Sequence, residues 1–347
     1  MTALGRSGGP RKPGLWLAVC LALAACASPD LVEQPEVKVE PRLTTESVRM
    51  PDGYRLPLTV WPQRRSGAQA QPDIVVLGLH GFNDYAKAFE PLARTLAESG
   101  IRTYAVDQRG FGAGALAGRW HGSRRLAADL PVLVNLLRAR HPRARLYLIG
   151  ESMGGAVIMS ALAQGALPVD GLVLIAPAVW SRDSMPWYQR VSLDAMVRIA
   201  PGMTLTGKGI SIHPSDNIDM LRAMGADPLV IKATRVDALW GITNLMDLAM
   251  AATPRLRGPV LLLYGEHDEI IPRTAFCRML RRLPHDDSGL RLVLYRRGWH
   301  MLPRDLQGTR VRADIAAWLQ SNQTPLPSGE ETALDSARLR AYCRSGH

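Results

Sequence analysis

Short apolar runs alternate with longer amphipathic segments through most of the chain. The runs are typical of buried parallel strands, and the segments between them have the spacing of helices. The predicted strands are 74–79, 102–106, 146–149, 172–175, 260–263 and 290–295, and the predicted helices are 85–99, 124–140, 154–164 and 311–319. This alternation predicts an α/β fold in which helices cover both faces of a mainly parallel sheet.

Two segments depart from the alternation. Residues 46–50 and 54–61 flank Pro51-Asp52-Gly53, which is a hairpin signal. Between about 178 and 254 the strand pattern stops, and methionine and tryptophan are frequent. We interpret this stretch as an α-helical lid over the carboxyl edge of the sheet, where open α/β sheets bind ligands. Its methionines either fill irregular gaps or form a deformable wall for an acyl chain.

The first 25 residues are typical of an export signal. Arg6, Arg11 and Lys12 precede an apolar run, 15–25, that is too short to cross a bilayer. The run ends in Leu23-Ala24-Ala25-Cys26, which resembles the lipobox of bacterial lipoproteins. The alternative is an ordinary secretory signal followed by an incidental cysteine.

The lipobox resemblance implies that Cys26 is acylated, for example with palmitate, and becomes the mature N-terminus. Residues 26–45, rich in proline and polar side chains, would then tether the protein to a membrane. Ala27 after the cysteine favours, by the same resemblance, the periplasmic face of a Gram-negative outer membrane. We therefore expect a lipid-anchored protein of the bacterial cell envelope.

The charge balance invites a nucleic-acid interpretation that the rest of the sequence does not support. The 347 residues carry a formal charge of +11, of which three positive charges lie in the leader. Much of the remaining excess lies in 87–145 and 273–297, without any nucleic-acid motif. Since export removes the protein from nucleic acid, we expect no such partner and instead an attraction to anionic lipid head groups.

A nucleophile motif follows the third predicted parallel strand. Gly150-Glu151-Ser152-Met153-Gly154-Gly155 has the G-x-S-x-G pattern, with a strand before it and a helix after it. The glycines at 150 and 154 remove side chains that would collide in so sharp a turn. The turn is expected to expose the Ser152 hydroxyl and to aim the Met153 N–H at an oxyanion.

A serine hydroxyl needs a base, and the base needs an orienting acid. Asp268 follows the strand 260–263, and His300 follows the strand 290–295, which is the chain order of this kind of hydrolase. Glu266 and Glu269 are rival acids, which we interpret as surface residues. His267, His285 and His347 are interpreted as loop or tail side chains, not as bases.

A second oxyanion donor is expected after the strand 74–79. His80-Gly81-Phe82 follows that strand, so the Phe82 N–H is the candidate, with His80 bracing the loop. We interpret Arg109, in the loop after the next strand, as a residue that holds neighbouring loops together.

With these motifs in place, residues 46–320 resemble a serine α/β-hydrolase, nearest to the monoacylglycerol lipase and lysophospholipase group. The resemblance rests on His80-Gly81, Asp107-x-Arg109-Gly110-x-Gly112, Gly150 to Gly155, Ala226-Asp227-Pro228-Leu229, Gly265-x-x-Asp268 and His300. It implies hydrolysis of carboxylic esters that carry one acyl chain, through an acyl-enzyme on Ser152. Phe111 stands where the family often has histidine, and 82–85 is less polar than usual, so the head group of the substrate stays open.

Three alternatives remain at this point. The same triad would serve an aminopeptidase, for which lid aspartates would hold an ammonium group, or a thioesterase; the scaffold could also belong to a non-catalytic envelope lipoprotein. We expect no cofactor and no metal, because no Cys/His metal spacing and no phosphate-binding glycine loop is present. Cys277 and Cys343 either pair or remain separate thiols. Residues 321–347 are expected to be a loosely ordered tail.

Overall fold

The computed structural model describes residues 32, 38–64, 71–207, 209, 211–284 and 289–344. The predicted leader (1–25), Cys26, His285 and His347 lie outside the described residues. In the described part of the chain, none of the helices is long and apolar enough to cross a bilayer.

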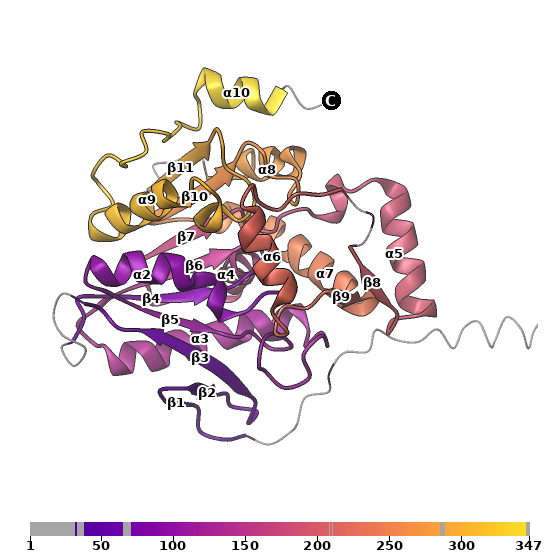
Figure 1. Ribbon diagram of the computed structural model, residues 1–347, viewed down its shortest axis with the longest axis horizontal. Coiled ribbons are helices and arrows are strands. Elements are labelled where there is room, and N and C mark those ends of the chain that lie inside the picture. Colours follow the sequence, from indigo (N-terminus) through magenta and orange to yellow (C-terminus); the bar gives the residue numbers. More distant parts are fainter. Residues whose placement is uncertain are drawn as a thin grey trace, which may run out of the picture.

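A nine-stranded sheet forms the centre of the described structure (Figure 1). Its order is β1-β2-β3-β5-β4-β6-β7-β10-β11. The first three strands, β1 (Arg42–Leu43), β2 (Ser47–Arg49) and β3 (Arg55–Trp61), pair antiparallel around the predicted hairpin. The others are parallel: β4 (Ile74–Leu79), β5 (Ile101–Val106), β6 (Arg145–Glu151), β7 (Gly171–Ile175), β10 (Val260–Gly265) and β11 (Leu290–Tyr295).

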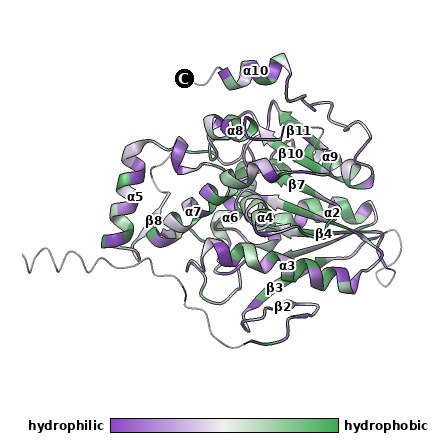
Figure 2. Cartoon of the chain, turned by 180° about the vertical axis from the view of Figure 1, so that it is seen from behind, coloured by the Kyte–Doolittle hydropathy of each residue, from purple (hydrophilic) through white to green (hydrophobic). Residues whose placement is uncertain are grey.

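Helices cover both faces of this sheet. On one face lie α3 (Ser123–Arg140), α4 (Met153–Gln164) and α8 (Arg273–Leu280); on the other lie η1 (Ala86–Phe89), α2 (Glu90–Glu98) and α9 (Gly308–Gln320). Every residue of β4, β7 and β10 is consequently buried, which explains their continuous apolar sequences. Figure 2 shows hydrophobic residues in these central strands. The predicted α/β-hydrolase fold is confirmed.

The segment between β7 and β10 forms a lid of helices and one small strand pair. It contains η2 (Arg182–Ser184), α5 (Trp187–Ile199), β8 (Thr204–Thr206), α6 (Ile218–Ala226), β9 (Ala233–Arg235), α7 (Val236–Ala252) and η3 (Thr253–Arg255). The expectation of a purely helical insertion missed the antiparallel pairing of β8 with β9. Each of these strands is only three residues long, which is too short for an alternating pattern to reveal it.

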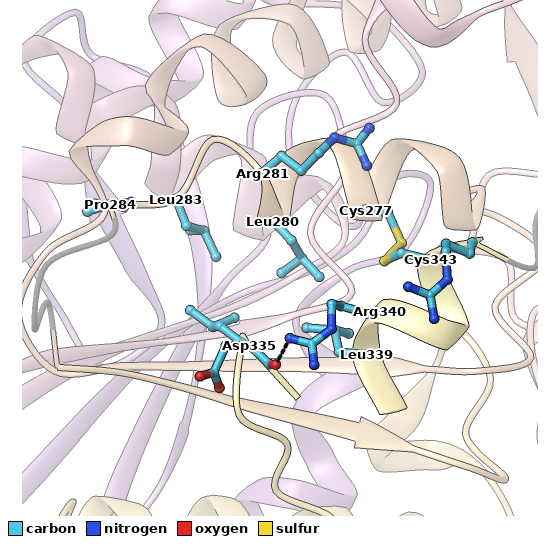
Figure 3. Close-up of a pocket in the computed structure, with 11 residues that line it drawn as sticks. Cys277, Leu280, Arg281, Leu283, Pro284, Asp335, Leu339, Arg340 and Cys343 are labelled. Carbon is cyan, nitrogen blue, oxygen red and sulfur yellow. Dashed lines mark hydrogen bonds between the residues drawn. A yellow bond between two sulfur atoms is a disulfide. The ribbon is translucent and has the colours of Figure 1, made fainter. Parts of the chain in front are cut away.

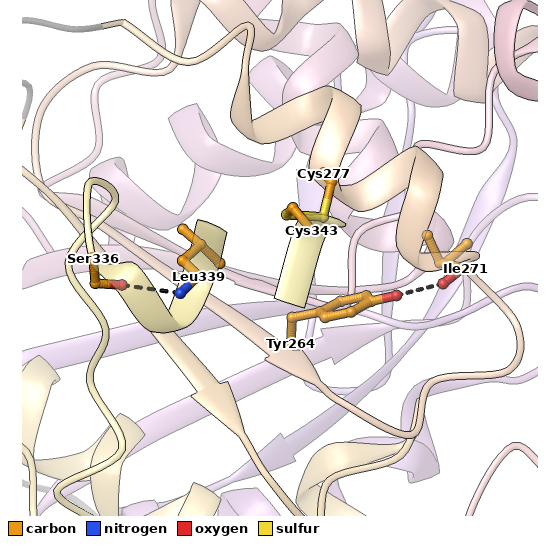
Figure 4. The surroundings of a disulfide bond; sticks show 6 residues. All are labelled: Tyr264, Ile271, Cys277, Ser336, Leu339 and Cys343. Carbon is orange, nitrogen blue, oxygen red and sulfur yellow. Dashed lines mark hydrogen bonds between the residues drawn. A yellow bond between two sulfur atoms is a disulfide. The ribbon is translucent and has the colours of Figure 1, made fainter. Parts of the chain in front are cut away.

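The expectation of a loosely ordered C-terminal tail is wrong for residues 321–344, the part of the tail that the structure describes. Glu331 pairs antiparallel with Val293 of the edge strand β11, and Thr332 N donates to Leu292 O at 2.8 Å. The chain then forms α10 (Ala337–Arg344), which a disulfide attaches to α8 (Figure 4). Polar composition hid this order, because it comes from an edge pairing and a covalent bond and not from a large apolar face of the tail itself.

The disulfide answers the question that the sequence left open. Cys277 and Cys343 are bonded, with their Cα atoms 5.7 Å apart across 66 residues of sequence. Such bonds persist in oxidising compartments. The pairing is therefore compatible with the export that the leader predicts.

Candidate active site

Ser152 occupies the sharp turn between β6 and α4. Its φ and ψ are 52° and −111°, a left-handed conformation that a residue with a Cβ rarely adopts. The backbone holds it there, since Ser152 N donates to Ile175 O at 2.9 Å and Ala178 N donates to Ser152 O at 2.9 Å. The strained serine between a strand and a helix is the geometry of a nucleophile elbow.

The two glycines of the motif are required by steric contact. A Cβ on Gly154 would lie 1.9 Å from Leu79 O, and a Cβ on Gly150 would lie 2.5 Å from Gly155 N. Both distances are far below van der Waals contact. The predicted steric reason for these glycines is confirmed, and the contact with Leu79 shows that the elbow packs directly against the end of β4.

The predicted acid and base meet across the turns after β10 and β11. His300 Nδ1 lies 2.8 Å from Asp268 Oδ2, and the other oxygen, Oδ1, accepts hydrogen bonds from Ile270 N at 2.8 Å and Ile271 N at 2.9 Å. With the carboxylate fixed by two backbone donors, the hydrogen bond to Nδ1 orients the imidazole. Nε2 is then the nitrogen left for proton transfer.

Opposing influences act on the pKa of His300, and the outcome is a raised value. Burial lowers the pKa, whereas the charge of Asp268, its hydrogen bond and the charge of Glu151 raise it. Arg304 lowers it slightly. The environment therefore stabilises the imidazolium that forms when a base takes the proton of a serine hydroxyl.

The rival acids and the extra histidine are engaged elsewhere. Glu266 Oε1 accepts from Arg338 at 2.6 Å, and Glu269 Oε2 accepts from His213 N at 2.6 Å. His267 stacks on Trp299, with ring centroids 5.5 Å apart. The structure thus brings Asp268, and not its neighbours, to the histidine.

The loop after β4 lies beside the serine. A Cβ on Gly81 would be 3.5 Å from Ser152 Cβ, so the backbone that leads into Phe82 faces the elbow. Met153 is the first residue of α4 and carries one of the N–H groups that have no partner within the helix. The two predicted oxyanion donors therefore belong to segments that meet at Ser152.

His80 is a bracing residue, as predicted. Its Nε2 accepts from Gln108 N at 2.9 Å, and its Nδ1 lies 2.8 Å from Gly81 O. Burial lowers its pKa, in keeping with a neutral ring. Arg109 bears out the predicted role in part, because it joins its own loop to the turn at Asp52, 2.8 Å away, and also to helix α3 at Asp129, 2.6 Å away.

Sequence reasoning missed a buried ion cluster behind the elbow. Arg304 Nη1 donates to Asp84 Oδ2 at 2.8 Å, and its Nη2 donates to Glu151 Oε1 at 3.0 Å. These residues are 220 and 153 positions apart in the sequence, so no local pattern connects them. The available signal was Glu151 itself, because a carboxylate in a buried turn requires a cation.

The lid closes over this centre and contacts its loops. Ser152 and His300 are 8% and 5% exposed. Asn83 O accepts from Ile231 N at 2.9 Å, and Tyr85 Oη donates to Asp227 Oδ2 at 2.7 Å. The candidate catalytic side chains are therefore largely shielded from solvent, and the lid is hydrogen-bonded to the loop that carries Phe82.

A separate pocket of about 620 Å³ lies between α8 and α10 (Figure 3). Cys277, Leu280, Leu283, Leu339 and Cys343 line it, and none of the candidate catalytic residues does.

Among the residues that the structure describes, no group of three His, Cys, Asp or Glu side chains could hold a metal ion.

The fold and the elbow define an α/β-hydrolase, and the comparison with known families agrees. Residues 70–307 match the model of the family described as Hydrolase_4, serine aminopeptidase, S33. The match covers more than half of the chain, and the protein belongs to this family.

Individual relatives narrow the resemblance. The chain is 25% identical over 278 residues to a monoacylglycerol lipase of Mycolicibacterium smegmatis, covering 78% of this chain and 94% of the relative. It is 25% identical over 260 residues to the monoglyceride lipase of Rattus norvegicus, covering 72% and 82%. The crystal structure of the monoacylglycerol lipase of Paleococcus ferrophilus superimposes with a TM-score of 0.63 at 22% identity, covering 77% and 99%. The predicted likeness to the monoacylglycerol lipase group is confirmed.

Proposed function

We propose that this protein is a serine hydrolase that cleaves the carboxylic esters of single-acyl lipids, of the monoacylglycerol or lysophospholipid kind. One observation carries the proposal. A serine in a strained strand-to-helix turn lies in a chain of this hydrolase family, together with a buried histidine that is hydrogen-bonded to a fixed aspartate.

The proposed mechanism proceeds through an acyl-enzyme. His300 Nε2 accepts the Ser152 proton as the hydroxyl oxygen attacks the ester carbonyl, and the N–H groups of Phe82 and Met153 stabilise the oxyanion. The imidazolium then protonates the departing alcohol. Water, deprotonated by His300, attacks the acyl-serine, and the proton returns to Ser152 when the fatty acid leaves.

The lid supports a lipid as the substrate. Its helix α5 presents Trp187, Val191 and Ile199 to solvent on one side, with exposed fractions of 69%, 59% and 81%. Such a surface can approach lipid aggregates, since exposed apolar patches mark interaction sites. The names of the curated relatives favour a glycerol head group for the substrate.

Replacing Ser152 tests the catalytic role directly. Ser152→Ala should lower the turnover of p-nitrophenyl butyrate about 10⁴-fold or more, because the nucleophile is lost. It should also abolish fluorophosphonate labelling. The matched control is Ser160→Ala, a second buried serine about two turns further into α4, which should keep both properties. Full turnover by Ser152→Ala would contradict the proposal, and failure of the wild-type protein to label would favour the non-catalytic alternative.

A series of acyl substrates then tests which head group and which type of acyl bond the enzyme prefers. Monoacylglycerols and lysophosphatidylcholines of equal chain length separate the two head groups, and acyl-thioesters test the thioesterase alternative. A preference of kcat/KM for thioesters over matched esters would replace the ester proposal.

An aminopeptidase is the second candidate, because the family model carries that description. The structure gives it little support from the lid, where all seven aspartates already have partners. Asp183, Asp219, Asp237 and Asp247 pair with arginines, Asp227 with Lys87 and Tyr85, Asp194 with Trp240, and Asp216 with the Leu306 N–H. Cleavage of aminoacyl p-nitroanilides faster than acyl esters would favour the aminopeptidase.

We also propose that Cys26 is lipidated and anchors the enzyme to the periplasmic face of a bacterial outer membrane. The lipobox-like sequence and the presence of a disulfide support an exported protein. Cys26→Ala should move the mature protein to the soluble fraction and remove the palmitate label. Cys20→Ala, which changes the other cysteine of the N-terminal segment, inside the leader that is expected to be removed, should do neither. A Cys26→Ala protein that stays labelled and bound to membranes would contradict the anchor.

A further inference from the structure

One buried guanidinium connects three loops that carry the proposed catalytic groups. Asp84 lies two residues after Phe82, Glu151 directly precedes Ser152, and Arg304 lies four residues after His300 at the end of η4 (Leu302–Arg304). The side chains of Arg304, Asp84 and Glu151 are 7%, 7% and 4% exposed. The contacts therefore fix the nucleophile, the base and one oxyanion donor relative to one another.

The chemistry of arginine suits this task. Its planar guanidinium presents several N–H donors in a rigid fork, so two carboxylates bound to it are held in defined directions as well as at defined distances. Lysine would supply the charge without the fork. A buried arginine that served stability alone could lie anywhere in the core, whereas this one contacts the loops of the active site.

The cluster also acts on the charge around the base. Three charged groups from different elements influence His300: Asp268 from the turn after β10, Glu151 from the end of β6, and Arg304 from its own loop. Glu151 raises the pKa of His300 and Arg304 lowers it. Removing the guanidinium would leave the negative charge of Glu151 near the base without its counterion.

We propose that Arg304 is a positioning residue for the hydrolytic reaction. Through Asp84 and Glu151 it holds the Phe82 loop and the Ser152 elbow at a fixed distance from the His300 turn, and it offsets the charge of Glu151 beside the base. The proposal rests on the serine hydrolase function proposed above.

The test compares Arg304→Met, Arg304→Lys and Glu151→Gln in the full chain, with p-nitrophenyl butyrate from pH 5 to 9. Arg304→Met should lower kcat about 100-fold with little change in KM, because small misplacements of reacting groups cost that much. The acidic limb of its pH–activity profile should move to higher pH, since the negative charge of Glu151 is no longer offset. Arg304→Lys should restore the position of this limb but only part of kcat.

Glu151→Gln keeps the side-chain shape and the Arg304–Asp84 pair, so it decides the matter if Arg304→Met fails to fold. Its acidic limb should move to lower pH, because the carboxylate that raises the pKa of His300 is gone. A merely structural cluster would change stability without moving either limb.

Arg138→Met is the matched control. Arg138 also joins three segments, donating to Pro168 O at 2.7 Å, Ala144 O at 2.9 Å and Asp170 Oδ2 at 2.6 Å, but it does so at the amino ends of β6 and β7. It should lower the melting temperature and leave kcat and the limb unchanged.

Two results would overturn the role of Arg304. The first is that the folded Arg304 and Glu151 variants keep the acidic limb of the wild-type pH profile and a kcat within about threefold of wild type. The second is that Arg138→Met lowers kcat as much as Arg304→Met does. Wild-type turnover and labelling of Ser152 are measured alongside. An active wild type with unchanged variants would reject Arg304 alone, and an inactive wild type would reject the proposed function.

Discussion

At the scale of single residues, the candidate active site contains two kinds of group, the proposed reacting groups and the groups that hold them in place. Gly150 and Gly154 indicated the sharp turn in the sequence, because no side chain fits at either position. The chain order of Ser152, Asp268 and His300 predicted that three residues distant in sequence lie at one edge of the sheet, and the structure brings His300 and Asp268 into hydrogen-bond contact. Arg304 was not predictable, because its partners come from loops that only the fold brings together. Motifs reveal groups that react, whereas groups that hold them in place emerge from tertiary contacts.

The raised pKa of His300 predicts the pH dependence of the reaction. As the proposed base, His300 must be neutral, so kcat/KM should fall as the pH decreases through the pKa of His300 in the folded protein, with a midpoint above the ordinary histidine value of about 6.5. Asp268→Asn should move the midpoint to lower pH and lower kcat about 10⁴-fold, since the orienting carboxylate is lost.

The measurement is the pH profile of kcat/KM for a short ester from pH 5 to 9. Asp335→Asn, an exposed acid in the C-terminal segment, serves as the control and should leave the profile unchanged. A wild-type midpoint well below 6.5 would show that the charge of Asp268 does not govern His300.

At the scale of elements, the parallel strands and their helices followed from periodicity, because both faces of the sheet are covered and each strand is a continuous apolar run. The short pair β8–β9 and the helix α10 did not. The strands β8 and β9 are only three residues long, and the C-terminal segment is held by contacts between residues distant in sequence, the bridge from Glu331 to Val293 and the bond between Cys277 and Cys343. The pattern of hydrophobic and polar residues within one segment cannot predict contacts of that segment with residues distant in sequence.

The disulfide should contribute strongly to stability. The double variant Cys277→Ser and Cys343→Ser removes a cross-link between residues 66 positions apart in the sequence. The unfolded chain gains conformational entropy as a result, which corresponds to about 4 kcal/mol of lost stability. The free energy of unfolding in urea should fall by about that amount, and a reducing agent should have the same effect on the wild type only. If the double variant and the wild type unfold at the same urea concentration, α10 is held by its other contacts.

At the scale of the whole molecule, charge and apolar surface point to a lipid boundary. Part of the positive charge does not reach the surface, since Arg109 is buried in ion pairs with Asp52 and Asp129. Most of the other basic residues in 87–145 are at least partly exposed. The net positive charge and the apolar face of α5 are together suited to an anionic membrane surface.

Binding to vesicles tests this view. The chain without its first 26 residues, and so without the proposed leader and lipidated cysteine, should co-sediment with phosphatidylglycerol vesicles at low salt and less with phosphatidylcholine vesicles, and binding should weaken as ionic strength rises. Trp187→Ala together with Val191→Ala should weaken binding at every salt concentration, whereas Arg338→Ala, remote from α5, serves as the comparison. Equal binding to both lipids would exclude a role for the net charge.

The hydrogen bonds between the lid and the Phe82 loop have a consequence for protein engineering. Asn83 Nδ2 donates to Thr234 Oγ1 at 2.7 Å, Asn83 O accepts from Ile231 N, and Tyr85 Oη donates to Asp227. The lid is therefore not an interchangeable module. A chimera that takes the lid of a relative must also take the matching residues 83–85, or it will carry a loop shaped for a cover that is no longer there.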